Sequence, residues 1–217
     1  MSLKLISYPN TKTESYSFDL PAKSTCPGKS KLCAKHCYAL QLERMYPEVD
    51  RKYKRNLIAA KSNHFISRII NELRSINEEE YDFRIHISGD FYSVPYIRKW
   101  ITIASARPST RFYAFTRSWR SSRLWPAIQE LAKLPNVCIS LSYDDETGEP
   151  PDASFKWAYM ATDDDTKKSV RPNDVVFRTG KLKHKIVHRI GGCRVCPLER
   201  GIKIPLTCKS CRICIER

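Results

Sequence analysis

The sequence of 217 residues contains no apolar run close to the roughly 18 residues that a membrane-spanning helix needs. Its first five residues also lack the apolar stretch of a secretory signal. No internal repeat, low-complexity tract or obvious linker interrupts the chain. Hydrophobic residues make up 41%, which excludes a disordered chain. We therefore expect a protein of the cytoplasm without a membrane partner, built as one domain or as one domain with a small appendage.

Acidic residues are scarce, because 23 Asp and Glu stand against 38 Lys and Arg, which gives a formal net charge of +15. Such an excess of positive charge favours a polyanionic partner, and nucleic acid or a nucleotide is the first candidate. The alternative is a basic protein whose charge serves only its solubility. Nothing in the sequence indicates an oligomeric state.

The nine cysteines fall into two groups, with Cys138 alone between them. In a reducing compartment, clustered cysteines more often hold metal or perform redox chemistry than form disulfides. A disulfide framework, which is typical of short secreted proteins, is the alternative. The first group comprises Cys26, Cys33 and Cys37, and the second comprises Cys193, Cys196, Cys208, Cys211 and Cys214.

The spacing within the second group predicts a metal centre. Its two-residue gaps let neighbouring thiolates converge on one centre, as tetrahedral zinc or a cubane cluster requires. Two CxxC pairs about a dozen residues apart fit a zinc ribbon, whereas the continuous run from Cys208 has the spacing of bacterial ferredoxins. We favour an iron–sulfur cluster and keep zinc as the alternative. The expected ligands are Cys196, Cys208, Cys211 and Cys214, with Cys193 as the spare.

The first group has the form Cys26-x6-Cys33-x3-Cys37 and supplies only three thiols. Three protein ligands leave one position of a metal centre open, and an open position is how such a centre binds a substrate. Alternatively, these thiols join the second group in a single structural site.

Strands and helices alternate along most of the chain, which predicts βαβ units and a parallel sheet. The right-handed crossover rule then favours an open sheet or a partial (β/α) barrel over residues 1–190. Residues 191–217 lack periodicity and are expected to form a cysteine-rich metal-binding appendage. The expected strands are 15–20, 83–88, 111–116, 137–142 and 155–160, and the expected helices are 50–76, 96–106 and 122–134.

Two of the expected strands have a polar second face. Arg84, His86 and Ser88 alternate with apolar residues in one of them, and Cys138, Ser140 and Ser142 do so in another. Because a buried parallel strand is normally apolar on both faces, these polar faces predict a cavity such as the interior of an incomplete barrel. An open sheet with one wet face is the alternative.

Polar groups also follow the strands, as in Gly89-Asp90, Thr116-Arg117-Ser118 and Asp144-Asp145. Ligands of parallel α/β proteins bind outside the carboxyl ends of the strands. Gly89 would let a ligand approach the backbone, and Asp90 could accept hydrogen bonds from an amine or hydroxyl. Asp90 could equally be a turn residue or a helix cap.

Taken together, these features resemble the radical S-adenosylmethionine superfamily. The resemblance lies in a three-cysteine loop that ends in Cys37-Tyr38, in the βα units that follow, and in Ser88-Gly89-Asp90-Phe91 after the second strand. It implies a [4Fe–4S] cluster on the first cysteine group, whose unique iron is chelated by S-adenosylmethionine, and an auxiliary cluster on the second group. The glycine-acidic stretch would contact the methionine amine. The superfamily spacing is Cys-x3-Cys-x2-Cys, from which this chain departs.

A closer resemblance covers most of the chain and concerns the phage gene product 88-like family. It implies a phage origin, and hence a host cytoplasm, and a shared fold, but no reaction. The segments that carry it, besides the terminal cysteines, are Asn10-Thr11-Lys12-Thr13, Thr25-Cys26-Pro27-Gly28, Cys37-Tyr38-Ala39, Ser88-Gly89-Asp90-Phe91 and Thr116-Arg117-Ser118.

The favoured function is an iron–sulfur enzyme similar to the radical S-adenosylmethionine enzymes, acting on a nucleotide or nucleic acid. A reductant would supply the electron, while the protein positions the reactants and excludes water. The residues expected to line the cofactor cavity are Gly89, Asp90, Ser140 and Ser142.

Two alternatives remain open. One is a nucleic-acid-binding protein with structural zinc or iron–sulfur, in which the segments 117–123 and 181–185 contact phosphates and Trp119 stacks on a base or packs on the next helix. The other is a cluster-dependent nuclease, in which His86 and Asp90 are the catalytic residues that activate water.

Overall fold

A six-stranded parallel sheet forms the centre of the molecule in the computed structural model, which describes residues 3–10, 13–76, 81–162, 175–179, 188–190, 193–199 and 205–216. Within these ranges the strands lie in sequential order, so each strand pairs with the next along the chain. The predicted α/β class with a parallel sheet is therefore confirmed. The strands are β1 (Tyr16–Phe18), β2 (Asp82–Ile85), β3 (Arg111–Thr116), β4 (Val137–Tyr143), β5 (Lys156–Ala161) and β6 (Val175–Arg178).

Two of the strands differ from the sequence-based expectation. The strand expected over 83–88 ends at Ile85, because the next residue, His86, has a φ of 72° and leaves the extended conformation. The strand β6 was not expected, since the chain around it shows no clear alternation. The other four strands lie where they were expected, within two residues at either end.

The helical segments also differ, and the short helices 31–35 and 208–211 were not expected. The expected helix 50–76 is two helices, because Ser62 adopts an extended conformation, with a ψ of 156°, and ends the first of them. Ile58, in the first of these helices, is 73% exposed. The helices are α1 (Lys31–Lys35), α2 (Tyr38–Met45), α3 (Pro47–Lys61), α4 (Phe65–Arg74), α5 (Val94–Ser105), α6 (Trp125–Ala132) and α7 (Cys208–Cys211), with short 3-10 turns η1 (Ser118–Arg120) and η4 (Pro197–Glu199).

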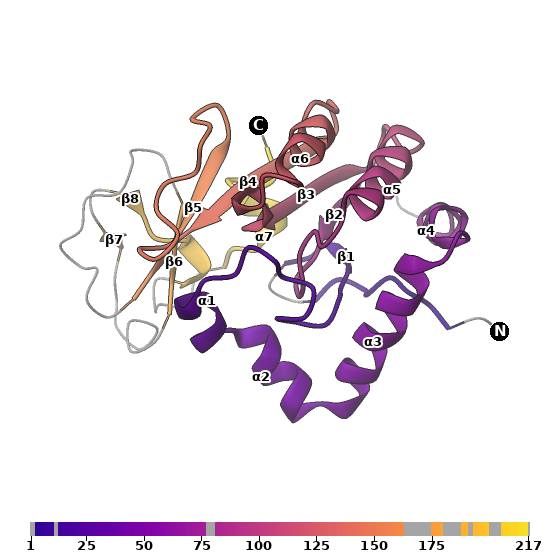
Figure 1. Ribbon diagram of the computed structural model, residues 1–217, viewed down its shortest axis with the longest axis horizontal. Coiled ribbons are helices and arrows are strands. Elements are labelled where there is room, and N and C mark those ends of the chain that lie inside the picture. The colour runs from indigo at the N-terminus through magenta and orange to yellow at the C-terminus, as the bar shows by residue number, and fades with distance from the viewer. Residues whose placement is uncertain are drawn as a thin grey trace.

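The main hydrophobic core lies between the sheet and the helices α4, α5 and α6, which run side by side along one face (Figure 1). This face is called the outer face below. Trp100 of α5 is fully buried at its centre, where its ring contacts those of Phe18, Phe65, Phe83 and Phe112. Burial of such large apolar surfaces is the main stabilising contribution to the fold.

The opposite, inner face of the sheet carries the other side chains of the alternation. In β4, Val137, Ile139 and Leu141 belong to the main core, whereas Cys138 belongs to a second, smaller cluster with Tyr113 of β3. The expected alternation of β4 is therefore confirmed. The carboxyl-terminal segment 205–216 packs on this inner face through Ile215 and Cys208.

The carboxyl-terminal segment is also tied to the amino-terminal ends of the strands. Lys156, the first residue of β5, donates from Nζ to the Ile213 carbonyl at 2.8 Å and also to the carbonyl of Glu216. Arg212 pairs with Asp82, the first residue of β2, at 3.4 Å. These contacts hold the last cysteines over the inner face.

The expected boundary between residues 190 and 191 crosses a small hairpin. Its strands are β7 (Arg189–Ile190) and β8 (Cys193–Arg194), and the next residue, Val195, bridges to Val176 of β6. Ile190, Cys193 and Val195 belong to the main core. In the described residues, both sides of the expected boundary thus share one core. None of the described helices combines the length and the apolar character needed to cross a membrane.

Replacement of Trp100 by Ala should lower the free energy of unfolding by about 3–5 kcal/mol, because it removes the ring at the centre of the core. Urea unfolding measures the effect. The matched control is Ile58→Ala on the exposed surface of α3, for which we expect a change within about 0.5 kcal/mol. Equal losses for the two variants would contradict this description of the core.

Candidate functional site

A cavity of about 560 Å³ lies on the inner face of the sheet, between the cysteine-containing loop of the amino-terminal region and the carboxyl-terminal segment. Its wall includes the inner-facing side chains of β2, β3, β5 and β6 and Ser142 of β4. The inner-facing side chains are Arg84, Tyr113, Phe115, Ala158, Met160, Val175 and Phe177. The predicted cavity is present, but Cys138 and Ser140, which were expected on its polar wall, do not line it.

Seven of the nine cysteines line this cavity, in two sets. All nine lie in described parts of the chain, and none is in a disulfide. The other two, Cys138 and Cys193, are buried away from the cavity. We call Cys26, Cys33 and Cys37 the loop thiols, and Cys196, Cys208, Cys211 and Cys214 the terminal thiols.

The loop thiols influence one another electrostatically. Burial raises the pKa of Cys26 to about 12, and negative charge on Asp90, Cys33 and Cys37 adds to the effect. Burial also raises the pKa of Cys33, which the positive charge of Arg117 opposes. Near neutral pH the sulfurs of Cys26 and Cys33 are therefore protonated until a metal displaces the protons.

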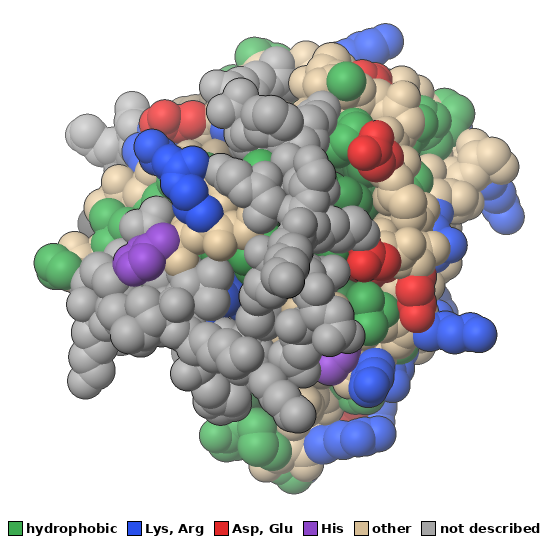
Figure 2. Space-filling view, turned by 90° about the vertical axis from the view of Figure 1, so that its left-hand side faces the viewer, with side chains coloured by type: hydrophobic (Ala, Val, Ile, Leu, Met, Phe, Trp, Pro, Cys, Tyr) green, Lys and Arg blue, Asp and Glu red, His purple; other side chains and the backbone are tan. Residues whose placement is uncertain are grey.

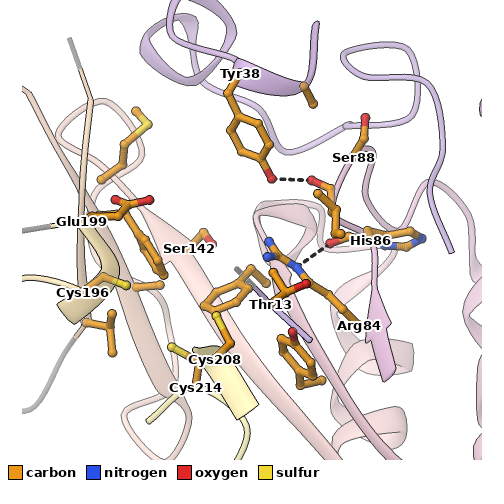
Figure 3. Close-up of a pocket in the computed structure, with 18 of the residues that line it drawn as sticks. Thr13, Tyr38, Arg84, His86, Ser88, Ser142, Cys196, Glu199, Cys208 and Cys214 are labelled. Atoms are coloured by element: carbon orange, nitrogen blue, oxygen red, sulfur yellow. Dashed lines mark hydrogen bonds between the residues drawn. The ribbon is translucent and has the colours of Figure 1, made fainter. Parts of the chain in front are cut away.

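The terminal thiols form a second electrostatic group. Burial raises the pKa of Cys214 to about 12, followed by the charges of Cys196, Cys208 and Cys211, while Arg84 opposes the shift. Cys196 is placed by a backbone hydrogen bond of 2.8 Å to Val176 of β6. The four thiols thus line the cavity from two separate segments, and Figure 3 shows Cys196, Cys208 and Cys214 among them.

As they stand, no three Cys, His, Asp or Glu side chains among the described residues lie close enough to hold one metal ion. Binding of a metal centre by either set of thiols therefore requires side chains to turn toward a common point.

The cysteine loop is fastened to the carboxyl ends of β3 and β4 by three buried side chains, Ser30, Arg117 and Asp144, which we call the loop clamp. The Ser30 hydroxyl caps α1 by accepting from the Cys33 backbone N–H at 2.8 Å, and it donates to Asp144 Oδ2 at 2.7 Å. The same oxygen accepts from Arg117 Nη1 at 2.6 Å. One carboxylate thereby fixes both the loop and the neighbouring strand end.

Close backbone packing reinforces the loop clamp. A Cβ on Gly28 would lie 1.8 Å from the Arg117 carbonyl oxygen, so only glycine fits there. Arg120 Nη1 donates to the Gly28 carbonyl at 3.0 Å, and the Leu32 N–H donates to Glu146 Oε2 at 2.9 Å. The loop therefore lies directly against the connections that follow β3 and β4.

Asp90, expected to bind an amine or hydroxyl of a ligand, already accepts three hydrogen bonds from the protein. Its Oδ1 accepts from Thr116 Oγ1 at 2.6 Å and from the Phe91 N–H at 2.7 Å, and its Oδ2 accepts from the Arg117 N–H at 2.9 Å. Burial raises its pKa, and these hydrogen bonds oppose the shift. Asp90 lines the cavity, but its bonds join the ends of β2 and β3.

The protein's own backbone and packing require a glycine at position 89. Its φ of 83° lies in the left-handed region, and a Cβ there would lie 2.6 Å from Leu20 Cβ and 2.7 Å from Thr25 Oγ1. The close approach expected of a ligand is thus made by the start of the cysteine loop.

His86 does not share a face with Arg84, contrary to the expected alternation, because its left-handed φ turns the chain. Its ring lies in the core beside Tyr96, with Nε2 2.7 Å from the Tyr96 hydroxyl, and points away from Arg84 (Figure 3). Burial and the charge of Arg84 lower its pKa to about 3, so the ring is neutral. On the cavity side, His86 contributes only its backbone carbonyl, which accepts a hydrogen bond from Arg84 Nε at 3.1 Å.

The remaining expected residues divide between cavity and core. Ser142 lines the cavity, whereas Ser140 is buried and does not. Trp119 is buried and donates from Nε1 to the Ser142 carbonyl at 2.9 Å, which matches packing and not base stacking. The segment 181–185 lies outside the described residues. Ser30, Tyr38 and Arg84 were not proposed as site residues, although the position of Ser30 three residues before Cys33 fits a helix cap.

Comparison with known proteins decides the family. The family model "Gene product 88" matches residues 3–217. The chain belongs to the gene product 88 family. Among curated proteins it is similar to the Gene 88 protein of Mycobacterium phage L5, with 28% identity over 102 residues, or 43% of each chain. It is also similar to the Gene 88 protein of Mycobacterium phage D29, with 28% identity over 129 residues, or 55% of this chain and 52% of that protein.

These comparisons limit which properties of the relatives can be assigned to this gene product 88 chain. The chain spans about half the length of the curated relatives it matches. No solved structure matches it. The predicted membership of a phage protein family is confirmed, while the likeness to radical S-adenosylmethionine enzymes remains a resemblance, since neither the family name nor the relatives' names state an activity.

Replacement of Ser30 by Ala should loosen the loop clamp, because it removes both the helix cap and a bond to Asp144. The loss of such a cap costs about 1 kcal/mol. When this loss lowers the free energy of local opening of the loop, Cys33 in reduced, metal-free protein should be alkylated about five times faster. Mass spectrometry of iodoacetamide-treated protein measures the rate. The control is Ser122→Ala at an exposed position, and an equal rate in both variants would exclude the clamp.

Replacement of His86 by Asn should make the protein less sensitive to acid. Because the folded pKa is about 3 and the ordinary value is 6.5, the unfolded chain binds an extra proton between these pH values. The stability contributed by a neutral His86 is therefore present above about pH 6.5 and lost as the pH falls toward 3. Asparagine tolerates the left-handed backbone and does not titrate.

Urea unfolding at pH 7 and pH 5 tests this effect of His86. The wild-type protein should lose about 2 kcal/mol more between the two pH values than the variant does. His64→Asn, which removes an exposed imidazole, should keep the wild-type pH dependence. The explanation fails if the His86 variant shows the same pH dependence as the wild type.

Proposed function

We propose that this chain is an iron–sulfur enzyme, in which the loop thiols hold a [4Fe–4S] cluster with one iron open to the cavity. The observation that carries the proposal is that the loop thiols and the terminal thiols line the same cavity at the carboxyl ends and inner face of a parallel sheet. Ligands of parallel α/β proteins bind at this end of the sheet.

The residues present fit such a group in their chemistry. Cysteine thiolates are the usual ligands of iron–sulfur clusters, and three of them leave one iron for a further ligand. The loop thiols are partly exposed toward a cavity whose volume of about 560 Å³ is typical of small-molecule sites. The loop clamp supports them from behind, as the supporting residues of metal sites do.

The chain's own side chains would position the reactants. When bound, a cluster supplies one-electron chemistry that no protein side chain provides. The resemblance to the radical enzymes favours S-adenosylmethionine as the ligand of the open position, with an outside reductant as electron source. Asp90 and Ser142 are among the lining groups that would meet it. The apolar side chains of β5 and β6 would exclude water.

For the terminal thiols we propose an auxiliary cluster on Cys196, Cys208, Cys211 and Cys214. Cys193 is the natural spare, because it is buried in the main core and does not line the cavity. Zinc is the competing assignment for this set. The two assignments differ in sulfide content, since zinc bound by thiolates carries none.

A nucleotide or nucleic acid is the proposed substrate class, supported by the net charge of +15. A module that only binds nucleic acid has less support. Trp119 is buried, and the Arg117 guanidinium is paired with Asp144 inside the protein. On the face in Figure 2, described Lys and Arg side chains are visible mainly along the edge of the view, and several lie close together at its lower right.

Iron and sulfide analysis of anaerobically purified protein tests the proposal. A [4Fe–4S] cluster contributes about four irons and four sulfides, so two clusters give about eight of each per chain. Cys33→Ala should lose one cluster and Cys196→Ala the other, whereas Cys193→Ala should keep both. Zinc without sulfide would rule out the iron–sulfur assignment.

The open position is tested by the visible spectrum before and after addition of S-adenosylmethionine. The wild-type spectrum should change, and the change should be absent from Cys33→Ala while it persists in Cys193→Ala. If iron and sulfide are present but the spectrum does not respond, the cluster does not bind this ligand.

A further inference from the structure

Arg84 extends from the middle of β2 into the cavity, in the space between Tyr38 and the terminal thiols (Figure 3). Its Nε donates to the His86 carbonyl at 3.1 Å, which fixes the direction of the side chain. The guanidinium lies over the Phe115 ring, 5.1 Å from its centroid. These contacts hold one edge and one face of the guanidinium and leave the outer edge, with both Nη atoms, toward the cavity.

Among the described residues, no carboxylate lies within ion-pair distance of Arg84. The other arginines nearby are paired, since Arg111 and Arg212 share Asp82 and Arg117 binds Asp144. Burial disfavours the charged form of Arg84, but Tyr38, Tyr113 and Asp19 nearby outweigh this effect and raise its pKa, so the guanidinium stays charged and can pair with a bound anion. Arginine's fixed fork of donors matches the paired oxygens of a carboxylate or phosphate.

The wall around Arg84 is otherwise aromatic and apolar. The Phe115 ring contacts those of Phe177 and Tyr113 edge to face, with centroids 5.4 Å and 6.4 Å apart. Met160 and Ile213 also line this part of the cavity. Such a surface accommodates a flat apolar group, while the charge offers a place for an anionic one. A ligand that fits has both parts.

We propose that Arg84 binds the phosphate of a nucleotide, whose base lies against the aromatic wall formed by Tyr113, Phe115 and Phe177. This assignment rests on the proposed function in taking the cavity as the substrate site. It narrows the proposed substrate class to a nucleoside monophosphate unit and names the side chain that selects it. The net charge of +15 attracts the same class of ligand from solution.

The competing role of Arg84 is that of a counter-ion to the terminal thiols, since its charge opposes the rise in the pKa of Cys214. The two roles differ in what they predict. A counter-ion affects metal content and has no preference among organic ligands. A phosphate-binding residue distinguishes a nucleotide from the corresponding nucleoside.

The experiment is anaerobic calorimetric titration of the full chain with the 5′-monophosphates of adenosine, guanosine, cytidine and uridine, and with the four nucleosides. At least one nucleotide should bind more tightly than its nucleoside. Arg84→Gln should weaken nucleotide binding about 10- to 100-fold and leave nucleoside binding unchanged. Arg98→Gln, at an exposed position on α5, should bind like the wild type.

A second variant, Arg84→Lys, provides a test for the case in which Arg84→Gln does not fold. Arg84→Lys keeps the charge but not the fork, so its affinity for nucleotides should fall between those of the wild type and Arg84→Gln. Thermal unfolding of each variant shows whether it is folded. If Arg84→Gln does not fold, the nucleotide affinity of Arg84→Lys is compared with that of Arg98→Gln, and equal affinities contradict the proposal.

The outcomes separate this inference from the proposed function. Phosphate-dependent binding that persists in Cys33→Ala and is lost in Arg84→Gln supports the inference, even if the protein contains neither iron nor sulfide. Equal affinity for nucleotides and nucleosides overturns it, even if both clusters are present. A loss of metal in Arg84→Gln with unchanged nucleotide preference assigns Arg84 to the terminal thiols instead.

Discussion

Two buried carboxylates at the carboxyl edge of the sheet hold the candidate site together. Asp90 joins the ends of β2 and β3, and Asp144 joins the end of β4 to Ser30 in the cysteine loop and to Arg117. A buried carboxylate is stable only when its oxygens accept hydrogen bonds, so each of them requires its donors to stay in place. The position of the loop thiols therefore depends directly on Asp144, while Asp90 fixes the strand ends beside the loop.

The two faces of the sheet have different roles, one in packing the core and one in forming the cavity. Its outer face is apolar and packs against α4, α5 and α6, with Trp100 at the centre of the core. Its inner face bears Arg84, Ser142 and several aromatic side chains and borders the cavity that the thiols line, and the carboxyl-terminal segment covers part of it. Stability and chemistry are thus assigned to opposite faces of the same strands, which the two-residue period of a β-strand permits.

Much of the fold could be predicted from local patterns. Alternation of apolar residues located β3, β4 and β5, and helical periodicity located α5 and α6. The predictions that were wrong have a different local cause, which is the backbone conformation of single residues. The left-handed backbone of His86 ended β2 early and moved its ring into the core, and the extended Ser62 divided one expected helix. Periodicity counts apolar positions and is insensitive to a single backbone angle.

The sequence by itself determined that the cysteines occur in two clustered sets and that the strands alternate between two unlike faces. The tertiary structure alone decided that both sets face one cavity, that Cys193 does not, and that Asp90 and Asp144 accept hydrogen bonds from the protein. Residues 33, 117 and 144 are far apart in the chain and become neighbours through the parallel pairing of β3 with β4 and the packing of the loop on their ends. Spacing reveals which residues can share a ligand locally, whereas strand order determines which distant residues meet.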